Sequence, residues 1–253
     1  MPNQTLMKII YRNYTASFII GIVIVLSAFV LAGAYTYKYK DKRRILVTGK
    51  AEKDFESDLI VWQGDYSRLS MNLKDAYSAL KNDEIAIRSY LTGKGLKNSE
   101  MIFSAVSINK IYQPQYDHNG RLISNNFGGY NLIQHVKIES MNIDQVEKIS
   151  REITELIQAG IELNSSPPSY YYTKMSELKI DLLAKASKDA RDRSQSIAEN
   201  AGSALGELKY ANTGVFQITG KNSNEDFSYG GTFNTSSRNK TASITLRTEY
   251  AIK

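Results

Sequence analysis

The strongest constraint on this chain is an uncharged stretch of 25 residues near its N-terminus, from Asn13 to Tyr37. Its centre, residues 18–34, reads FIIGIVIVLSAFVLAGA. At about 1.5 Å per residue, a helix of 25 residues reaches roughly 37 Å, which is enough to cross a hydrocarbon layer about 30 Å thick. The sequence therefore predicts a transmembrane helix over residues 18–37, after a short tail of residues 1–17.

The flanks of this stretch have the composition of a membrane interface. Tyrosines lie on both sides of it, as in the aromatic belts of membrane proteins, and residues 38–44 form a basic juxtamembrane linker. Anionic headgroups attract such basic segments. We expect the bilayer to be a partner of the chain and its interface to contact Tyr11, Tyr14, Tyr35, Tyr37, Lys38, Lys40, Arg43 and Arg44.

The distribution of charge argues against nucleic-acid binding. The net charge is +6, and residues 1–44 account for all of it, with seven basic side chains and one acidic side chain. The remaining 25 basic and 25 acidic groups cancel. Because phosphate backbones are bound through an excess of Lys and Arg, a neutral body predicts no nucleic-acid partner.

Two questions about the apolar stretch stay open at this point. Lys8 and Arg12 before it, and Ala32-Gly33-Ala34 at its end, also fit a cleaved signal peptide, although the apolar run exceeds the usual 7–15 residues. Five basic residues follow the stretch and two precede it, which by the positive-inside rule favours a cytoplasmic domain. Long domains, however, cross the membrane largely regardless of that bias.

Residues 45–253 predict an α+β fold with a mixed or antiparallel sheet and three helices, in the order ββαββαβαββ. Apolar residues recur at three- and four-residue steps in the helical segments and alternate in the strands. The expected helices are residues 70–91, 142–159 and 176–201. The expected strands are residues 45–49, 59–62, 102–113, 130–139, 161–172 (interrupted at Pro167-Pro168), 210–219 and 242–252.

Three surface features are candidates for contacts. The polar tract of residues 221–240 predicts a long flexible loop. Tyr170, Tyr171 and Tyr172 follow a Pro-Pro pair that cannot donate to a ladder, so they are expected near a sheet edge, where tyrosines often contact partners. Arg191 and Arg193 belong to a mixed charge run that predicts either a solvated helix face or a row of salt bridges between subunits.

Catalytic and metal chemistry find little support. The chain has no cysteine, which excludes disulfides, thiolate catalysis and Cys-type metal sites. Its two histidines, His118 and His135, are expected in a turn and in a strand. Thr92-Gly93-Lys94-Gly95 lacks the spacing of a phosphate-binding loop. We therefore predict no catalytic, cofactor-binding or metal-binding residue, no cofactor, and a non-enzymatic protein.

Several short motifs occur together in a characteristic order. VTGKAE at residues 47–52 is followed by Asp58; Pro114, Tyr116, Gly120 and Gly129-Tyr130 mark the predicted hairpin; and Ala159-Gly160-Ile161 follows the second helix. The most specific is Ala-x-x-Asp-Ala-Arg, then Ala, Gly and Gly at residues 198, 202 and 206. Together they resemble the SIMPL domain family over residues 45–253. Ser57, where the family often has Pro, and Ser194, where Ala is usual, depart from it.

The resemblance implies a bacterial cell-envelope protein of a family largely without a defined function. Some relatives are exported to the periplasm, some form rings, and phenotypes have been linked to oxidative stress. It therefore favours a periplasmic domain and a self-associating scaffold, with an envelope protein as a further partner. The alternative is a monomeric binding module that captures a protein or small ligand through the tyrosine-rich edge.

Overall fold

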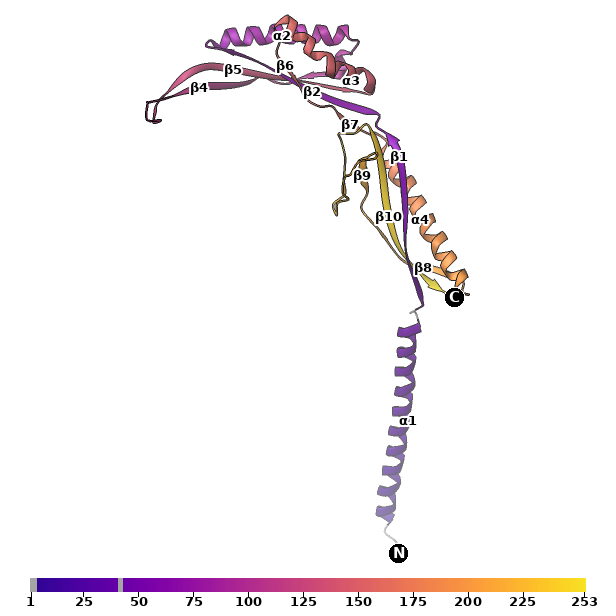
Figure 1. Cartoon of the computed structure of the whole chain (residues 1–253). Helices are drawn as coiled ribbons and strands as arrows, with labels where there is room; N and C mark the ends of the chain where they lie inside the picture. The colour runs from indigo at the N-terminus through magenta and orange to yellow at the C-terminus, as the bar shows by residue number, and fades with distance from the viewer. Residues whose placement is uncertain (1–3, 41–42) are drawn as a thin grey trace. The chain divides into compact units, whose positions relative to one another are not determined.

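The computed structural model describes the backbone of residues 4–40 and 43–253, and the side chains of residues 17–38 and 43–253. Its helices, with the 3-10 helices written η, are α1 Gln4–Lys40, α2 Leu73–Gly93, η1 Asn98–Glu100, α3 Ile143–Glu152, η2 Ile153–Ala159 and α4 Met175–Asn200 (Figure 1). Its strands are β1 Arg44–Glu56, β2 Leu59–Ser70, β3 Met101–Phe103, β4 Ser107–Tyr116, β5 Leu122–Ser140, β6 Leu163–Ser165, β7 Ser169–Tyr171, β8 Leu205–Thr213, β9 Gln217–Gly220 and β10 Asn239–Ile252.

Helix α1 is the predicted apolar helix. Its segment Ser17–Lys38 is long and apolar enough to cross a membrane, as a membrane anchor or a signal peptide would be. The side chains of this segment are exposed, which suits lipid and not water. Helix α1 includes the backbone of Tyr11, Tyr14 and Lys40, but the side chains of these three predicted interface residues lie outside the described part.

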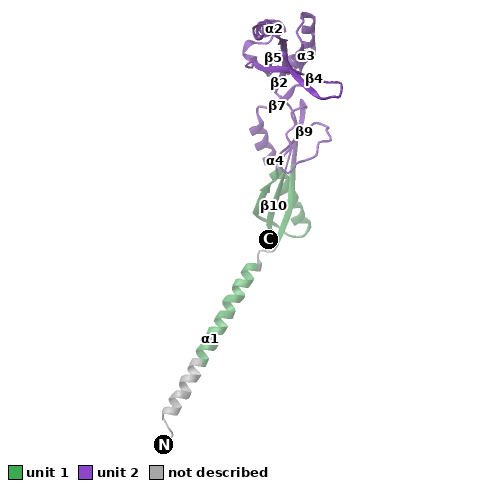
Figure 2. Ribbon diagram, turned by 90° about the vertical axis from the view of Figure 1, so that its left-hand side faces the viewer, with its two compact units in different colours: residues 1–50, 186–214, 245–253 green, residues 51–185, 215–244 purple. Residues whose placement is uncertain are grey.

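The chain forms two compact units (Figure 2). Unit 1 comprises residues 1–50, 186–214 and 245–253, and unit 2 comprises residues 51–185 and 215–244. Strands β1 and β10 and helix α4 contribute residues to both.

Unit 2 is built on an antiparallel sheet with the order β3-β5-β2-β6, to which β4 adds on β5 and β7 on β2. Its centre is the long pairing of β2 with β5, from Ile60 opposite Ser140 to Ser70 opposite Tyr130. Helices α2 and α3 contact both central strands. Asn72 and Asn142 cap these helices: each side-chain oxygen accepts a hydrogen bond from a backbone N–H of the first turn.

The core of unit 2 consists of large apolar side chains between the sheet and its helices. Trp62 and Leu132 from the sheet, and Leu80 and Ile87 from α2, are completely buried. The indole N–H of Trp62 donates to Ser165 Oγ at 3.0 Å, so its polar edge is also satisfied. The apolar residues that recur every three or four positions in α2 therefore form the helix face that packs on this core.

In unit 1, by contrast, the backbone of a helix lies very close to the backbone of a strand. Its strands follow the order β1-β10-β8, and the residues of α4 from Ala186 onward lie against one face. A Cβ atom added to Gly49 would lie 2.3 Å from the carbonyl oxygen of Ala186 and 2.6 Å from the backbone nitrogen of Ala190. The small residues spaced by four along α4 thus let helix and strand backbones touch.

The predicted class, α+β with antiparallel pairing and an N-terminal apolar helix, is confirmed; the element count and order need correction. Two 3-10 helices are added, and η2 takes over the second half of the expected helix of residues 142–159. The expected strand of residues 102–113 divides into β3 and β4, that of residues 161–172 into β6 and β7, and that of residues 210–219 into β8 and β9. Strand β5 begins eight residues before the expected strand of residues 130–139.

The segment of residues 221–238, which falls in the predicted flexible loop, is held by several polar contacts. The Glu225 carboxylate accepts hydrogen bonds from Gly220 N at 2.8 Å and from the Asn234 amide. The Lys240 ammonium group donates to the backbone oxygen of Asn234 at 2.5 Å. The mobility of this loop and the domain limits stay predictions.

Candidate functional site

A β-hairpin of residues 107–128, here named the hairpin arm, is the most exposed regular structure of unit 2. Every residue of β4 is exposed, and among the described residues β4 pairs only with β5, so its outer edge is free. Figure 1 shows the arm extending beyond the ends of α2 and α3. The outer part of the arm is a two-stranded ribbon, the kind of structure that is only marginally stable when it is isolated in water.

An aromatic row connects the arm to the core of unit 2. Opposite Ile108 of β4 lies the buried Leu132, so the inner part of β4 continues the core-facing side of the sheet. Beyond it, the ring of Phe127 lies 5.0 Å from that of Tyr130 and 5.9 Å from that of Tyr112, both edge-on. The core-facing side of the sheet therefore runs onto the arm, past the helices that cover it elsewhere.

The arm is apolar and weakly charged. Its exposed large apolar side chains are Ile108, Ile111, Tyr112, Tyr116, Leu122, Ile123 and Phe127. Strand β4 has one charged residue, Lys110. Natural edge strands usually avoid self-pairing through charged residues, proline or a bulge. In β4, Pro114 and the register shifts after Ile111 and Gln115 are features of this kind. Pro114 and both register shifts come after Ile111, so the inner half of β4 has Lys110 as its one feature of this kind.

The predicted tyrosine contact surface is partly engaged within the fold. Tyr170 packs against the core of unit 2, and its hydroxyl donates to Glu147 at 2.9 Å. The ring of Tyr172 lies 4.9 Å from that of Phe55. Tyr171 lies in β7 opposite Leu59. These contacts make two of the three rings part of the packing of unit 2.

The predicted arginine pair lies on α4 in unit 1. Arg193 donates to Asp189, four residues earlier, at 3.0 Å, and Asp189 also accepts a hydrogen bond from the backbone N–H of Lys50. Both contacts lower the pKa of Asp189, the backbone hydrogen bond most strongly. Arg191 is exposed. The local pairing of Arg193 is the arrangement expected for a solvated helix face.

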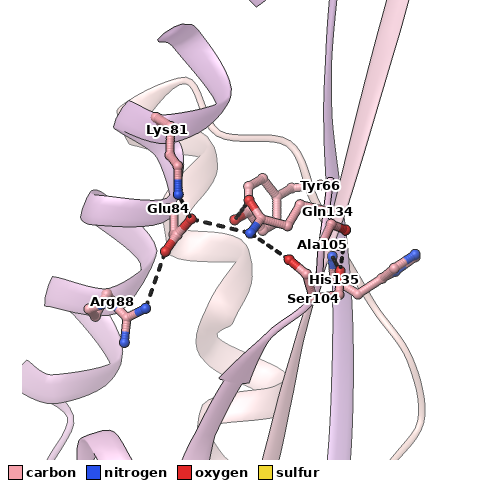
Figure 3. Close-up of polar contacts among 8 residues, drawn as sticks. All are labelled: Tyr66, Lys81, Glu84, Arg88, Ser104, Ala105, Gln134 and His135. Carbon is pink, nitrogen blue, oxygen red and sulfur yellow. Dashed lines mark hydrogen bonds and ion pairs between the residues drawn. The ribbon is translucent and has the colours of Figure 1, made fainter. Parts of the chain in front are cut away.

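A polar network lies between α2 and the sheet of unit 2 (Figure 3). Tyr66 donates to Gln134 at 2.8 Å, and the Gln134 amide donates to Glu84 and to the Ser104 carbonyl oxygen. Burial raises the pKa of Tyr66. Burial alone would also raise the pKa of Glu84, but hydrogen bonds from Lys81, Arg88 and Gln134 lower it. The network joins α2 to β5 with each of these groups satisfied.

The imidazole rings of the two histidines do not point into this network, although the backbone N–H of His135 donates to Ser104 Oγ at 3.0 Å (Figure 3). His118 is in the exposed turn between β4 and β5, where the Asp117 carboxylate accepts from the backbone N–H groups of Asn119 and Arg121. The side chain of His135 is exposed and points away from Gln134 in Figure 3. Among the side chains that the structure describes, those of residues 17–38 and 43–253, there is no group of three or more metal-ligating residues.

A second charged cluster surrounds Arg238 in unit 2. Its guanidinium donates to Asp144 and, at 2.6 Å, to Glu56; both hydrogen bonds raise the pKa of Arg238, the one to Asp144 most strongly. These residues and Ser57 line an open hollow of about 450 Å³. Ser57 Oγ is buried and has no hydrogen-bond partner among the described residues. Ser57 therefore places a hydroxyl next to the charged cluster.

The predicted membrane-interface residues lie in part within the described residues. Tyr35 and Tyr37 are exposed near the end of α1, with Lys38 beside them, and Arg43 is exposed just before β1. Arg44 donates a hydrogen bond to Glu249 of β10. The linker thus ends in a residue that belongs to the sheet of unit 1.

A comparison with protein families identifies the family of this chain. Residues 45–247 match the SIMPL family, described as a protein of unknown function (DUF541). The chain belongs to the SIMPL family. No curated protein matches it. The predicted resemblance is therefore confirmed: this is a SIMPL-domain protein of a family without a known function, and an apolar helix long enough to be a membrane anchor precedes the domain.

The hairpin arm is the functional candidate that the sequence analysis missed. The Asn119-Gly120 turn was recognisable, but residues 122–129 were not expected to pair with β4. Their signal was weak because Asn125, Asn126, Gly128 and Gly129 interrupt the alternation of apolar side chains. What makes the arm a candidate is its exposure, which only the folded chain shows.

Proposed function

We propose that this SIMPL protein is a single-pass, membrane-anchored component of the bacterial cell envelope that self-associates through its hairpin arm. In this proposal α1 stays uncleaved and the SIMPL domain is a non-enzymatic scaffold. The observation that carries the proposal is the arm: a two-stranded ribbon with a free edge and exposed apolar side chains on a chain tethered by an apolar helix.

A second copy is the occupant that suits the arm best. Strand β4 has few charges and a free edge, so the inner halves of two β4 strands can pair antiparallel about a two-fold axis. That pairing would cover Ile111 and Tyr112 on both copies. Confinement to a membrane raises the local concentration of the domains, which favours such a contact even when it is weak.

The absence of cysteine makes a direct test simple, because one substitution introduces a unique thiol. Asn109→Cys places that thiol in the inner half of β4, and Ser89→Cys places it on the exposed side of α2 as the matched control. After mild oxidation of native membranes, we expect a disulfide-linked dimer for Asn109→Cys and a much smaller amount for Ser89→Cys. Monomer alone for both variants would refute self-association through the arm.

The same thiols test the location of the domain. We place it on the periplasmic side because the SIMPL resemblance implies export, against the charge bias of the linker. A membrane-impermeant maleimide should label Ser89→Cys in cells whose outer membrane is permeabilised and whose inner membrane is intact. Labelling only after lysis would place the domain in the cytoplasm. An N-terminal sequence beginning near Tyr35 would show that the helix is cleaved.

The alternative function is a monomeric module that binds an envelope protein or small ligand at Tyr170–Tyr172. It is the weaker proposal because Tyr170 and Tyr172 already contact Glu147 and Phe55 within unit 2. Loss of a specific partner on Tyr171→Ala, together with monomers in the thiol experiment, would make it the preferred reading.

A further inference from the structure

The open face of the unit 1 sheet has a polar hollow, and the β1 residues at its edge follow a few positions after the end of α1. One face of this sheet, with Ile45 and Val47, packs on Ala198 of α4. The other face has an open hollow of about 500 Å³. Its lining residues come from three strands: Arg44, Leu46, Tyr210, Arg247 and Glu249.

The charge of this hollow is positive. Two guanidinium groups and one carboxylate line it, for a net charge of +1. The Glu249 carboxylate accepts from Arg44 and so holds that guanidinium at the rim. Arg247 forms no ion pair within the part of the chain that the structure describes. Tyr210, directly opposite Glu249 in the β8–β10 pairing, adds a hydroxyl.

The tether limits how far this hollow can lie from a membrane. Arg44 follows Lys40, the last residue of α1, by four positions, and four residues span at most about 14 Å. The apolar segment of α1 ends at Lys38. Because each headgroup layer adds roughly 5–8 Å to the hydrocarbon core, the β1 edge of the hollow is held within reach of the headgroups of the bilayer that α1 crosses.

We propose that this hollow binds the phosphate headgroup of an anionic phospholipid, with Arg247 and Arg44 as the charged donors and Tyr210 as a neutral donor. Guanidinium groups suit phosphate because their planar N–H groups form paired, charge-assisted hydrogen bonds. Leu46 offers an apolar wall to the glycerol side of the headgroup. The proposal rests on the proposed function in one respect, the insertion of α1 in a bilayer.

The site goes beyond general attraction by the basic linker. Lys38, Lys40 and Arg43 attract any anionic surface, and salt screens that attraction. Arg247 and Tyr210 lie far from the linker in sequence and reach the hollow through the pairing of β8 with β10. Substitution of these two residues can therefore separate binding of one headgroup in the hollow from the general attraction between the linker and lipid charge.

The test uses the full-length protein in phosphatidylcholine nanodiscs with or without phosphatidylglycerol. Amide hydrogen exchange is followed in residues 44–47, 208–212 and 245–249. We expect slower exchange there when phosphatidylglycerol is present, and loss of most of this protection, roughly tenfold, in Arg247→Gln. The matched control is Arg121→Gln, an exposed arginine in the turn of the hairpin arm, which should keep the protection.

Each other outcome overturns the proposal in a recognisable way. Equal exchange with and without phosphatidylglycerol in inserted protein would refute the headgroup site and leave the anchor intact. Protection that persists in Arg247→Gln would assign the effect to the linker alone. The same protection from inorganic phosphate in phosphatidylcholine discs would identify a free-anion site. Failure of the chain to enter nanodiscs would refute the anchor instead.

Discussion

The two units of this SIMPL protein cover a sheet with helices in opposite ways. In unit 2, α2 and α3 fill the space above the sheet with large side chains such as Leu80 and Ile149. In unit 1, α4 presents Ala186 and Ala190 to Gly49 and brings two backbones into contact. The first arrangement depends on volume, so it is sensitive to atoms removed, whereas the second depends on the absence of side chains, so it is sensitive to atoms added.

The largest expected effect comes from removing volume in unit 2. Leu132 is completely buried in β5, and Leu132→Ala should lower the free energy of unfolding by about 2–5 kcal/mol because it leaves a cavity. Trp62, the one tryptophan of the chain, lies in the same core and reports unfolding of unit 2 by fluorescence.

Ile123→Ala, on the exposed hairpin arm, is the control and should change the unfolding free energy by less than about 0.5 kcal/mol. An equal loss in both variants would contradict the distinction between a filled core and an uncovered arm.

The next effect concerns a charge that unit 2 buries. Lys240 is 1% exposed, and burial lowers its pKa to about 8, against a weak opposing attraction from Glu225. Between pH 8 and about 10.5 the unfolded chain then holds more protons than the folded chain, so the free energy of unfolding should rise with pH by up to about 3 kcal/mol.

Urea unfolding at a series of pH values measures this slope. Lys240→Met should remove it, and Lys209→Met, an exposed lysine of β8, should keep it. A slope unchanged in Lys240→Met would assign the pH dependence to other groups.

The smallest effect sharpens the unit 1 side of the comparison. Gly49→Ala adds one methyl group against the backbone of α4, which cannot rotate away, and should cost about 1–3 kcal/mol. Gly93→Ala, with open space around the added atom, should be neutral or slightly stabilising. Hydrogen exchange in β1 and in residues 245–252 of β10 is the measurement, since Trp62 reports unit 2. Equal exchange in both variants would show that helix and strand do not need this close approach.

Local features of this chain were predictable because their causes are local. The apolar stretch of α1 follows from its length and lack of charge. Recurrence at three- and four-residue steps predicted a helix over residues 176–201, and the structure has α4 at Met175–Asn200. Gly120, with a φ of +75°, takes the left-handed conformation that the Asn-Gly turn requires. Of the family motifs, the segment from Ala186 to Arg191 lies in α4 and Gly120 lies in this turn.

The contacts that suggest function depended on the fold. Nothing in the order of residues shows that Arg44 meets Glu249, that Arg238 meets Asp144, or that β4 keeps a free edge. The sequence also did not show that the ring of Tyr172, expected in a contact surface, packs against Phe55 within unit 2. Periodicity and turn chemistry act over a few neighbouring residues, so they determine where helices, strands and turns form. Which surfaces are covered and which stay open is decided only when distant segments pack, because exposure is a property of the whole arrangement.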